Sequence, residues 1–233
     1  GGLVIMGPKT ESIFINTIFE HLTSPNIGSS GLTASITTYD TDISFQKCTF
    51  EQNESEDFLN LVHSKYELRD SHFKSVQSDA VDSDYSNGLI INSIFTDIGN
   101  DAMDFSGSIS EVFEISIDGV GDKALSAGEM SNISGKHIDI TNAEIGITSK
   151  DLSEVNLSDV KIKDTRLGFA VFQKKEEYGA GKAKITDLEM TNVNFIHLVD
   201  LNSTLTLNGN DVISKRSNVG DLLYGVNFGK SSK

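Results

Sequence analysis

Two stretches decide the fold: Ser-Asp-Ala-Val-Asp-Ser-Asp-Tyr-Ser at residues 78–86, and Gly-Asn-Asp-Ala-Met-Asp-Phe-Ser-Gly at residues 99–107. Their Asp-Ala-apolar-Asp phrases start at Asp79 and Asp101, 22 positions apart. In both phrases apolar or small residues alternate with polar ones, which is the pattern of a half-buried β-strand. A strand-like phrase that returns at a fixed distance indicates a repeat architecture.

The repeat extends in both directions from these two phrases. Related alternation starts at residues 57, 79, 101, 123, 145 and 167. A second pattern, apolar-any-apolar with an apolar or small residue three positions further on, starts at residues 13, 43, 66, 89, 115, 138, 160 and 188. Each repeat thus holds at least two short strands, with Ser, Asn, Asp and Gly at the junctions. One repeat cannot bury its apolar side alone, so the copies must stack.

We therefore predict an all-β fold, a right-handed parallel β-helix solenoid of about 8–9 coils. At ~4.8 Å per coil the rod would be roughly 40 Å long. A leucine-rich repeat is the competing architecture. It requires an apolar residue three positions before each core pattern, and five of the eight places fail this requirement. It also requires Asn or Cys three positions after the second apolar residue, which only Cys48 satisfies.

The predicted domain organisation is one β-helix over residues 1–211, followed by a C-terminal cap or tail over residues 212–233, where the repeat is lost. Residues 173–182 form the clearest inserted loop. The chain begins Gly1-Gly2-Leu3, which we interpret as a segment excised from a longer protein. Cys48 is the only cysteine, so an internal disulfide is excluded.

The chain is strongly acidic, with 34 Asp and Glu against 19 Lys and Arg and a formal charge of −15. Such a surface repels phosphate, which argues against nucleic acid and anionic membranes as partners. Stretches long enough for a membrane span are missing from the sequence. Cations, neutral glycans, basic protein surfaces and a neighbouring domain of a longer chain remain as partners.

The aspartates of the two central phrases are the strongest local signal. In register, Asp79 stacks on Asp101, and Asp82 stacks on Asp104. If Val81 points inward, Asp82 and Asp84 point outward together. Carboxylates ~5 Å apart repel by about 0.8 kcal/mol in water, and the repulsion grows at lower dielectric.

Three explanations of these aspartates stay open. Asp82, Asp84 and Asp104 are the candidate ligands for Ca²⁺, which prefers carboxylate oxygens. A shared proton with one raised pKa would suit acid–base chemistry. Alternatively, Asp79 and Asp101 cap backbone N–H groups at a turn and have no other role.

A substrate-binding interpretation adds further residues on the same face. Asp79, Asp101, Lys123, Lys150 and Tyr85 are the candidate substrate-binding residues. Sugar sites usually offer aromatic rings, and Tyr85 is a plausible outward ring in a chain without Trp. An acidic patch beside lysines suggests a groove for uronic acids, in which Ca²⁺ would neutralise the sugar carboxylate and Lys would accept a proton. Among Ser, Thr, Cys and His, a nucleophile–base arrangement does not stand out.

The same two phrases resemble the bacterial right-handed parallel β-helix repeat family of the pectate-lyase-like superfamily. The later phrase Gly-Asp-Lys-Ala-Leu-Ser-Ala-Gly-Glu at residues 121–129 is similar to β-helix modules that accompany spore-coat CotH-like kinase domains. The resemblance covers most of residues 10–200. It implies the fold, an extracellular or cell-surface bacterial location and a role with glycans. It implies no catalytic residue, because the residues of a characterised lyase are not matched position by position.

Three functions follow as hypotheses. The first is a non-catalytic β-helix module of a bacterial surface or secreted protein that binds a glycan or a partner domain. The second is a polysaccharide lyase or epimerase acting on a uronic-acid polymer. The third is a purely structural stalk. The sequence does not decide whether the protein is an enzyme.

Overall fold

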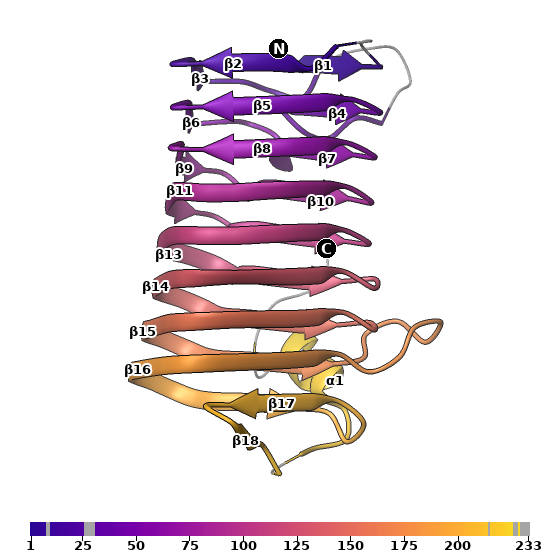
Figure 1. Ribbon diagram of the computed structural model, residues 1–233, viewed down its shortest axis with the longest axis vertical. Helices are drawn as coiled ribbons and strands as arrows, with labels where there is room; N and C mark the ends of the chain where they lie inside the picture. Colours follow the sequence, from indigo (N-terminus) through magenta and orange to yellow (C-terminus); the bar gives the residue numbers. More distant parts are fainter. Residues whose placement is uncertain (8–9, 26–30, 214, 226–227, 229–233) are drawn as a thin grey trace.

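The computed structural model describes residues 1–7, 10–25, 31–213, 215–225 and 228. The protein is a right-handed parallel β-helix of about eight turns, with the N-terminal rung at one end of the stack (Figure 1). This confirms the predicted fold. The leucine-rich repeat is excluded, because the described part of the chain is mostly strand and contains one short helix.

The first three turns consist of three separate strands each, and later turns merge neighbouring strands into one long bent strand. The separate strands of these turns are β1 (Leu3–Met6), β2 (Ser12–Ile15), β3 (Ile18–Glu20), β4 (Ile36–Tyr39), β5 (Asp42–Gln46), β6 (Thr49–Glu51), β7 (Asp57–Val62), β8 (Lys65–Arg69) and β9 (His72–Val76). The later strands are β10 (Asp79–Asp84), β11 (Asn87–Ile98), β12 (Met103–Ser106), β13 (Ile109–Gly128), β14 (Asn132–Lys150), β15 (Glu154–Phe172), β16 (Lys182–Val199), β17 (Thr204–Leu207) and β18 (Asn210–Asp211).

The register of the central rungs follows the predicted repeat. Strand β10 pairs in parallel with β12, so that Val81 lies against Met103 and Asp82 against Asp104. Strand β10 also pairs with β7 on its other side, where Asp82 lies against Asn60. Parallel rungs in register place equivalent side chains in columns, which is how residues distant in sequence become neighbours on the surface.

The core is a set of apolar columns inside the coil. Phe50 stacks on Phe73 with ring centroids 4.2 Å apart, and Phe73 stacks on Phe95 at 5.1 Å. Val81 and Met103 are fully buried. Stacked rings of this kind add stabilisation beyond the area they bury. The predicted inward direction of Val81 is therefore confirmed.

A buried column of serines holds one of the turns in register. The hydroxyl oxygen of Ser86 accepts the N–H of Ser64 at 2.9 Å, and that of Ser108 accepts the N–H of Ser86 at 3.0 Å. Ser131 and Ser153 continue the series. These hydroxyls satisfy backbone donors where the strands are interrupted, which buried N–H groups require.

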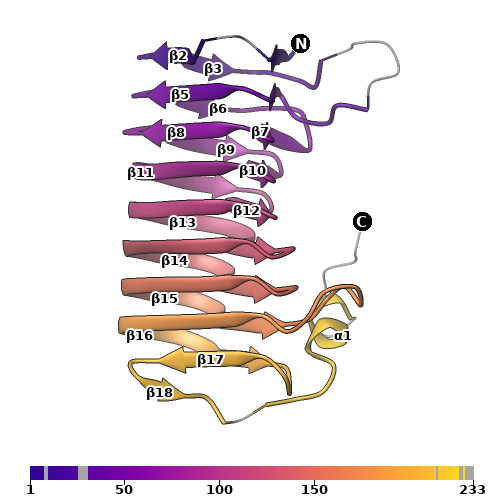
Figure 2. The same cartoon turned by 45° about the vertical axis from the view of Figure 1, so that its right-hand side comes forward.

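The C-terminal part leaves the stack and packs against its side. Helix α1 (Val219–Tyr224) lies outside the rungs near their C-terminal end (Figure 2). Val219 and Leu223 of α1 cover outward apolar side chains that include Leu167 and Phe172. The inserted loop between β15 and β16 is confirmed and lies close to α1. Lys230 and Lys233 of the predicted tail lie outside the described residues. The described helix is too short to cross a membrane.

Candidate functional site

One lateral face of the solenoid carries the predicted site residues. Strands β7, β10 and β12 and the C-terminal ends of β13, β14 and β15 stack to form this face. One outward column contains Asn60, Asp82, Asp104, Ser126 and Thr148. We name Asp82, Asp84 and Asp104 the acidic cluster. The structure thus brings together the three carboxylates that the sequence predicted to be neighbours.

Asn60 links two members of the acidic cluster. Its side-chain amide Nδ2 donates to Oδ2 of Asp82 at 2.9 Å and to Oδ2 of Asp84 at 3.0 Å. The amide therefore offsets part of the repulsion between these two carboxylates. The sequence analysis missed Asn60, although it stands one repeat before Asp82 and this position was a usable signal.

Lys150 lies two rungs away from Asp104, the third carboxylate of the cluster, and contacts it. Its Nζ lies 3.6 Å from Oδ1 of Asp104 and donates to the hydroxyl of Ser126 at 2.8 Å. Gly128 makes room for this long side chain, because a Cβ at Gly128 would lie 2.9 Å from Cε of Lys150. Lys150 is itself nearly buried, so it acts on Asp104 more than on a ligand in solvent.

The carboxylates of the cluster have opposite pKa shifts. Burial, followed by the charges of Asp84 and Asp104, raises the pKa of Asp82 well above its ordinary value. Burial would also raise the pKa of Asp104, but the nearby ammonium groups of Lys150 and Lys123 outweigh it and lower that pKa. Two adjacent rungs therefore hold one carboxyl group that favours its proton and one that favours its charge.

Asp79 and Asp101 act as turn caps. Oδ1 of Asp79 accepts the backbone N–H of Asp101 at 2.8 Å and the amide of Asn100 at 2.6 Å. Oδ1 of Asp101 accepts the backbone N–H of Lys123 at 2.9 Å. The capping explanation accounts for these two residues, and the structure gives them no separate contact that points to a substrate.

Lys123 is an internal cation. Its Nζ lies 3.2 Å from Oδ2 of Asp101 and 2.6 Å from Oδ2 of Asp122, and the side chain is 8% exposed. Burial would lower the pKa of Lys123, but the two carboxylates raise it. The residue is thus held protonated inside the protein and is poorly suited to accept a proton from a substrate.

Tyr85 presents an exposed ring at the edge of the cluster. Tyr85 directly follows Asp84 in the chain, and the residue is 53% exposed. Its ring stacks on His63 with centroids 5.5 Å apart, and Tyr39 packs edge-on against His63 at 5.8 Å. Gly107, with φ +62°, lies against the ring, since a Cβ there would be 2.5 Å from it. The predicted outward position of Tyr85 is confirmed.

Calcium fits this arrangement poorly. Within the described ranges, we find no three His, Cys, Asp or Glu side chains that converge as the ligands of one metal ion. Nδ2 of Asn60 already bridges Asp82 and Asp84, and Nζ of Lys150 already lies beside Asp104. The assignment of Ca²⁺ to Asp82, Asp84 and Asp104 stays a prediction, and no step below depends on a metal.

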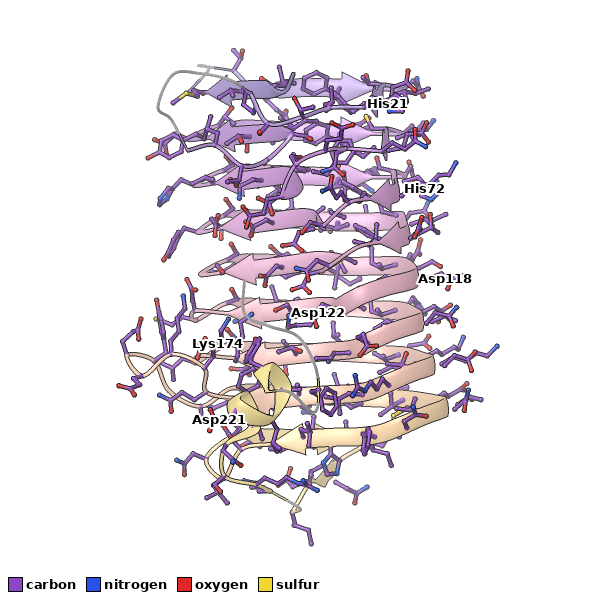
Figure 3. The ribbon with its side chains drawn as sticks, turned by 180° about the vertical axis from the view of Figure 1, so that it is seen from behind. His21, His72, Asp118, Asp122, Lys174 and Asp221 are labelled. Carbon is purple, nitrogen blue, oxygen red and sulfur yellow. The ribbon has the colours of Figure 1, made fainter. Side chains whose placement is uncertain are left out.

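A second feature lies further along the same face, where the inserted loop approaches α1. Nζ of Lys174 lies over the ring of Tyr224, 4.7 Å from its centroid. Figure 3 shows Lys174, Asp122 and Asp221 on this side of the solenoid, around α1. The ring of Tyr224 also borders Lys123. The charge of Lys174 also helps to lower the pKa of Asp104, so the inserted loop, and α1 packed against it, lie close to the acidic cluster.

Comparison with known proteins yields structural likeness only. The sequence matches no known family model, and no curated protein is similar to it at a significant level. Among solved structures, it resembles the catalytic domain of a GH87 alpha-1,3-glucanase, as an aspartate-to-alanine variant in complex with nigerose. That comparison has a TM-score of 0.53 at 11% identity and covers 88% of this chain and 49% of the other.

The same variant of this domain, in complex with tetrasaccharides, aligns over 91% of this chain and 59% of the other, with 10% identity and a TM-score of 0.35. This chain thus spans about half of the length of the first of these domains. At 11% identity the likeness to the nigerose complex shows a shared fold alone, and it leaves the activity to be argued from the residues of the site.

Proposed function

We propose that the protein is a glycan-binding β-helix module of a bacterial surface or secreted protein, and that it binds a polysaccharide on the face of the acidic cluster. One observation carries the proposal: Tyr85, which is 53% exposed, directly follows Asp84 at the end of the strand that holds Asp82 and Asp84, and this strand pairs with the strand of Asp104. Sugars present both an apolar ring face and hydroxyl donors. An aromatic ring next to fixed acceptors is suited to both.

The charge of the site narrows the class of glycan. Even with Asp82 protonated, the carboxylates of Asp84 and Asp104 stand against the single charge of Lys150, whose Nζ lies 3.6 Å from Oδ1 of Asp104, so the cluster keeps a small excess of negative charge. A uronic-acid polymer would be repelled by this charge. The lyase hypothesis also loses its proposed base, because Lys123 is paired with Asp101 and Asp122. A neutral or amino-sugar polymer is therefore the favoured ligand.

Replacing Tyr85 by alanine should weaken glycan binding about two- to tenfold, because a stacked ring contributes roughly 0.5–1.5 kcal/mol. Titration calorimetry with α-1,3-linked gluco-oligosaccharides, chitosan oligosaccharides and oligogalacturonates measures this. Tyr85→Phe keeps the ring and should retain most of the affinity. Ile109→Ala, which removes an exposed apolar side chain on β13, is the matched control. Failure of all three glycans to bind the unmodified protein would contradict the proposal.

The opposite pKa shifts of Asp82 and Asp104 favour a second candidate, hydrolysis of a glycosidic bond. A carboxyl group with a raised pKa can protonate the leaving oxygen, and at the ~5 Å spacing of adjacent rungs the ionised neighbour can attack the anomeric carbon as the glycosidic bond breaks, which forms a glycosyl ester. Water, deprotonated by the first carboxyl group after it has given up its proton, then bonds to the anomeric carbon and releases the second carboxylate. The shared fold with a glucanase domain is compatible with this chemistry but does not establish it.

If the protein hydrolyses a glycan, Asp82→Asn should reduce the release of reducing ends about a hundredfold, within the usual contribution of a general acid. The rate should fall as pH rises through the raised pKa of Asp82, because only the protonated acid can donate. The exposed Asp118→Asn is the control variant and should keep the full rate. If α-1,3-linked gluco-oligosaccharides and chitosan oligosaccharides stay intact with unmodified protein, the module is restricted to binding.

A further inference from the structure

The C-terminal segment and the inserted loop enclose a cleft of about 680 Å³ on the side of the solenoid. Lys174 and Glu176 of the loop form one wall, and Asp221 and Tyr224 of α1 form the other. This volume is within the range of small-molecule sites. The lining combines an aromatic ring with charged and amide groups, so the cleft offers the same kinds of contact as the surface around Tyr85.

Asp200 ties the two walls of the cleft together. Its Oδ2 accepts the backbone N–H of Gln173 at 3.1 Å, and its Oδ1 accepts the backbone N–H of Val219 at 3.0 Å. The buried Asp151 fixes the loop from the other side, where its Oδ1 accepts the N–H of Lys174 at 2.6 Å and of Lys175 at 2.8 Å. The side chains of Lys174 and Tyr224 are thus presented from a backbone that is held in place.

The cleft is aligned with the acidic cluster along the long axis. Asp84, Ser106, Gly128, Lys150 and Phe172 stand in one column, and the ring of Tyr224 lies 6.4 Å from that of Phe172. Four rungs separate the first and last members of this column, which corresponds to about 19 Å at ~4.8 Å per rung. Phe172 is fully buried and Lys150 is 7% exposed, so a ligand at this end of the column would contact α1 and the loop rather than the column itself. A single sugar ring is too short to span the rungs between Tyr85 and Tyr224.

From this alignment, and resting on the proposed function, we infer that the ligand is an oligosaccharide chain that lies lengthwise along the solenoid. One end stacks on Tyr85 beside the acidic cluster. The other end enters the cleft between the loop and α1, where Lys174 and Tyr224 form a second subsite. The C-terminal segment is therefore part of the binding surface as well as a cover for the apolar side chains of β15.

Titration calorimetry with a length series of α-1,3-linked gluco-oligosaccharides and of chitosan oligosaccharides, from disaccharide to hexasaccharide, tests this inference. Affinity of the unmodified protein should rise with length until the chain reaches both subsites. Lys174→Ala and Tyr224→Ala should each lose several-fold in affinity for the longest oligosaccharides and leave the disaccharide unchanged. Tyr85→Ala should weaken the binding of every length.

The variants separate this inference from the proposed function. If Tyr85→Ala weakens binding but affinity is independent of length and of Lys174 and Tyr224, the second subsite is wrong and the first remains. If no oligosaccharide binds, both fail. Lys174→Ala should keep the fold intact, because the loop is held by backbone N–H groups and the lysine side chain is exposed. A loss of affinity in this variant therefore reports on the second subsite and not on misfolding. Lys161→Ala, an exposed lysine of β15, should behave as unmodified protein.

Discussion

Replacing Lys123 by alanine is expected to lower the free energy of unfolding by about 3–5 kcal/mol, the usual cost of removing one partner from a buried ion pair. The ammonium group is 3.2 Å from Asp101 and 2.6 Å from Asp122, and the side chains of Lys123 and Asp101 are 8% and 3% exposed. Without the lysine, these carboxylates would face each other across a poorly solvated space. Chemical denaturation at pH 7 measures the loss.

A matched surface pair provides the control. Nζ of Lys161 lies 3.9 Å from Oδ1 of Asp139, and both side chains are more than half exposed. Lys161→Ala should change the free energy of unfolding by less than about 1 kcal/mol, because water screens such pairs. The double variant Lys123→Met with Asp101→Asn should recover part of the loss, since it removes charge from both sides. A loss for Lys123→Ala no larger than that for Lys161→Ala would show that Lys123 is hydrated rather than internal.

The columns of the site could be predicted from sequence because parallel rungs in register convert a spacing into a contact. The period that relates Asp79 to Asp101 also places Asp82 on Asp104, and the structure has this pairing. The capping role of Asp79 was foreseeable too, because a carboxylate at the start of a strand commonly accepts a nearby backbone N–H.

The contacts between columns could not be predicted in this way. Lys150 reaches Asp104 across two rungs only because Gly128 leaves space, and this depends on side-chain direction rather than on period. The packing of α1 on Phe172 was equally hidden, since the tail has no repeat to set its position. Sequence reasoning therefore found which carboxylates are neighbours, and it missed which groups neutralise them.

Asp57 illustrates how one column can hold residues with opposite energetic roles. Asp79 and Asp101 each accept the backbone N–H of the equivalent residue in the next rung along the chain. For Asp57 that donor would be the N–H of Asp79, but this N–H donates to the carbonyl oxygen of Glu56 instead. Among the residues that the structure describes, the hydroxyl of Thr33 makes a long contact with the carboxylate of Asp57, at 3.5 Å. Burial, and then the charges of Asp79 and Glu56, raise the pKa of Asp57 from 3.8 to about 7.

A raised carboxyl pKa makes the folded state bind more protons than the unfolded state between pH 4 and 7, so stability must fall as pH rises through this window. The shift from 3.8 to about 7 corresponds to at most about 4 kcal/mol, at 1.36 kcal/mol per unit. Asp57→Asn removes the titration. We expect this variant to be more stable than the unmodified protein at pH 8, by roughly 1–4 kcal/mol, and similar to it at pH 4.

Denaturation curves at pH 4, 6 and 8 test this expectation, with the exposed Asp118→Asn as the control for a change of net charge alone. The control should shift all three curves by a similar small amount, whereas Asp57→Asn should flatten the dependence on pH. A parallel shift for Asp57→Asn would mean that Asp57 stays ionised in the folded protein. In that case water or a cation must reach the carboxylate of Asp57. The end of the acidic face nearest the N-terminus would then be an open site rather than a buried one.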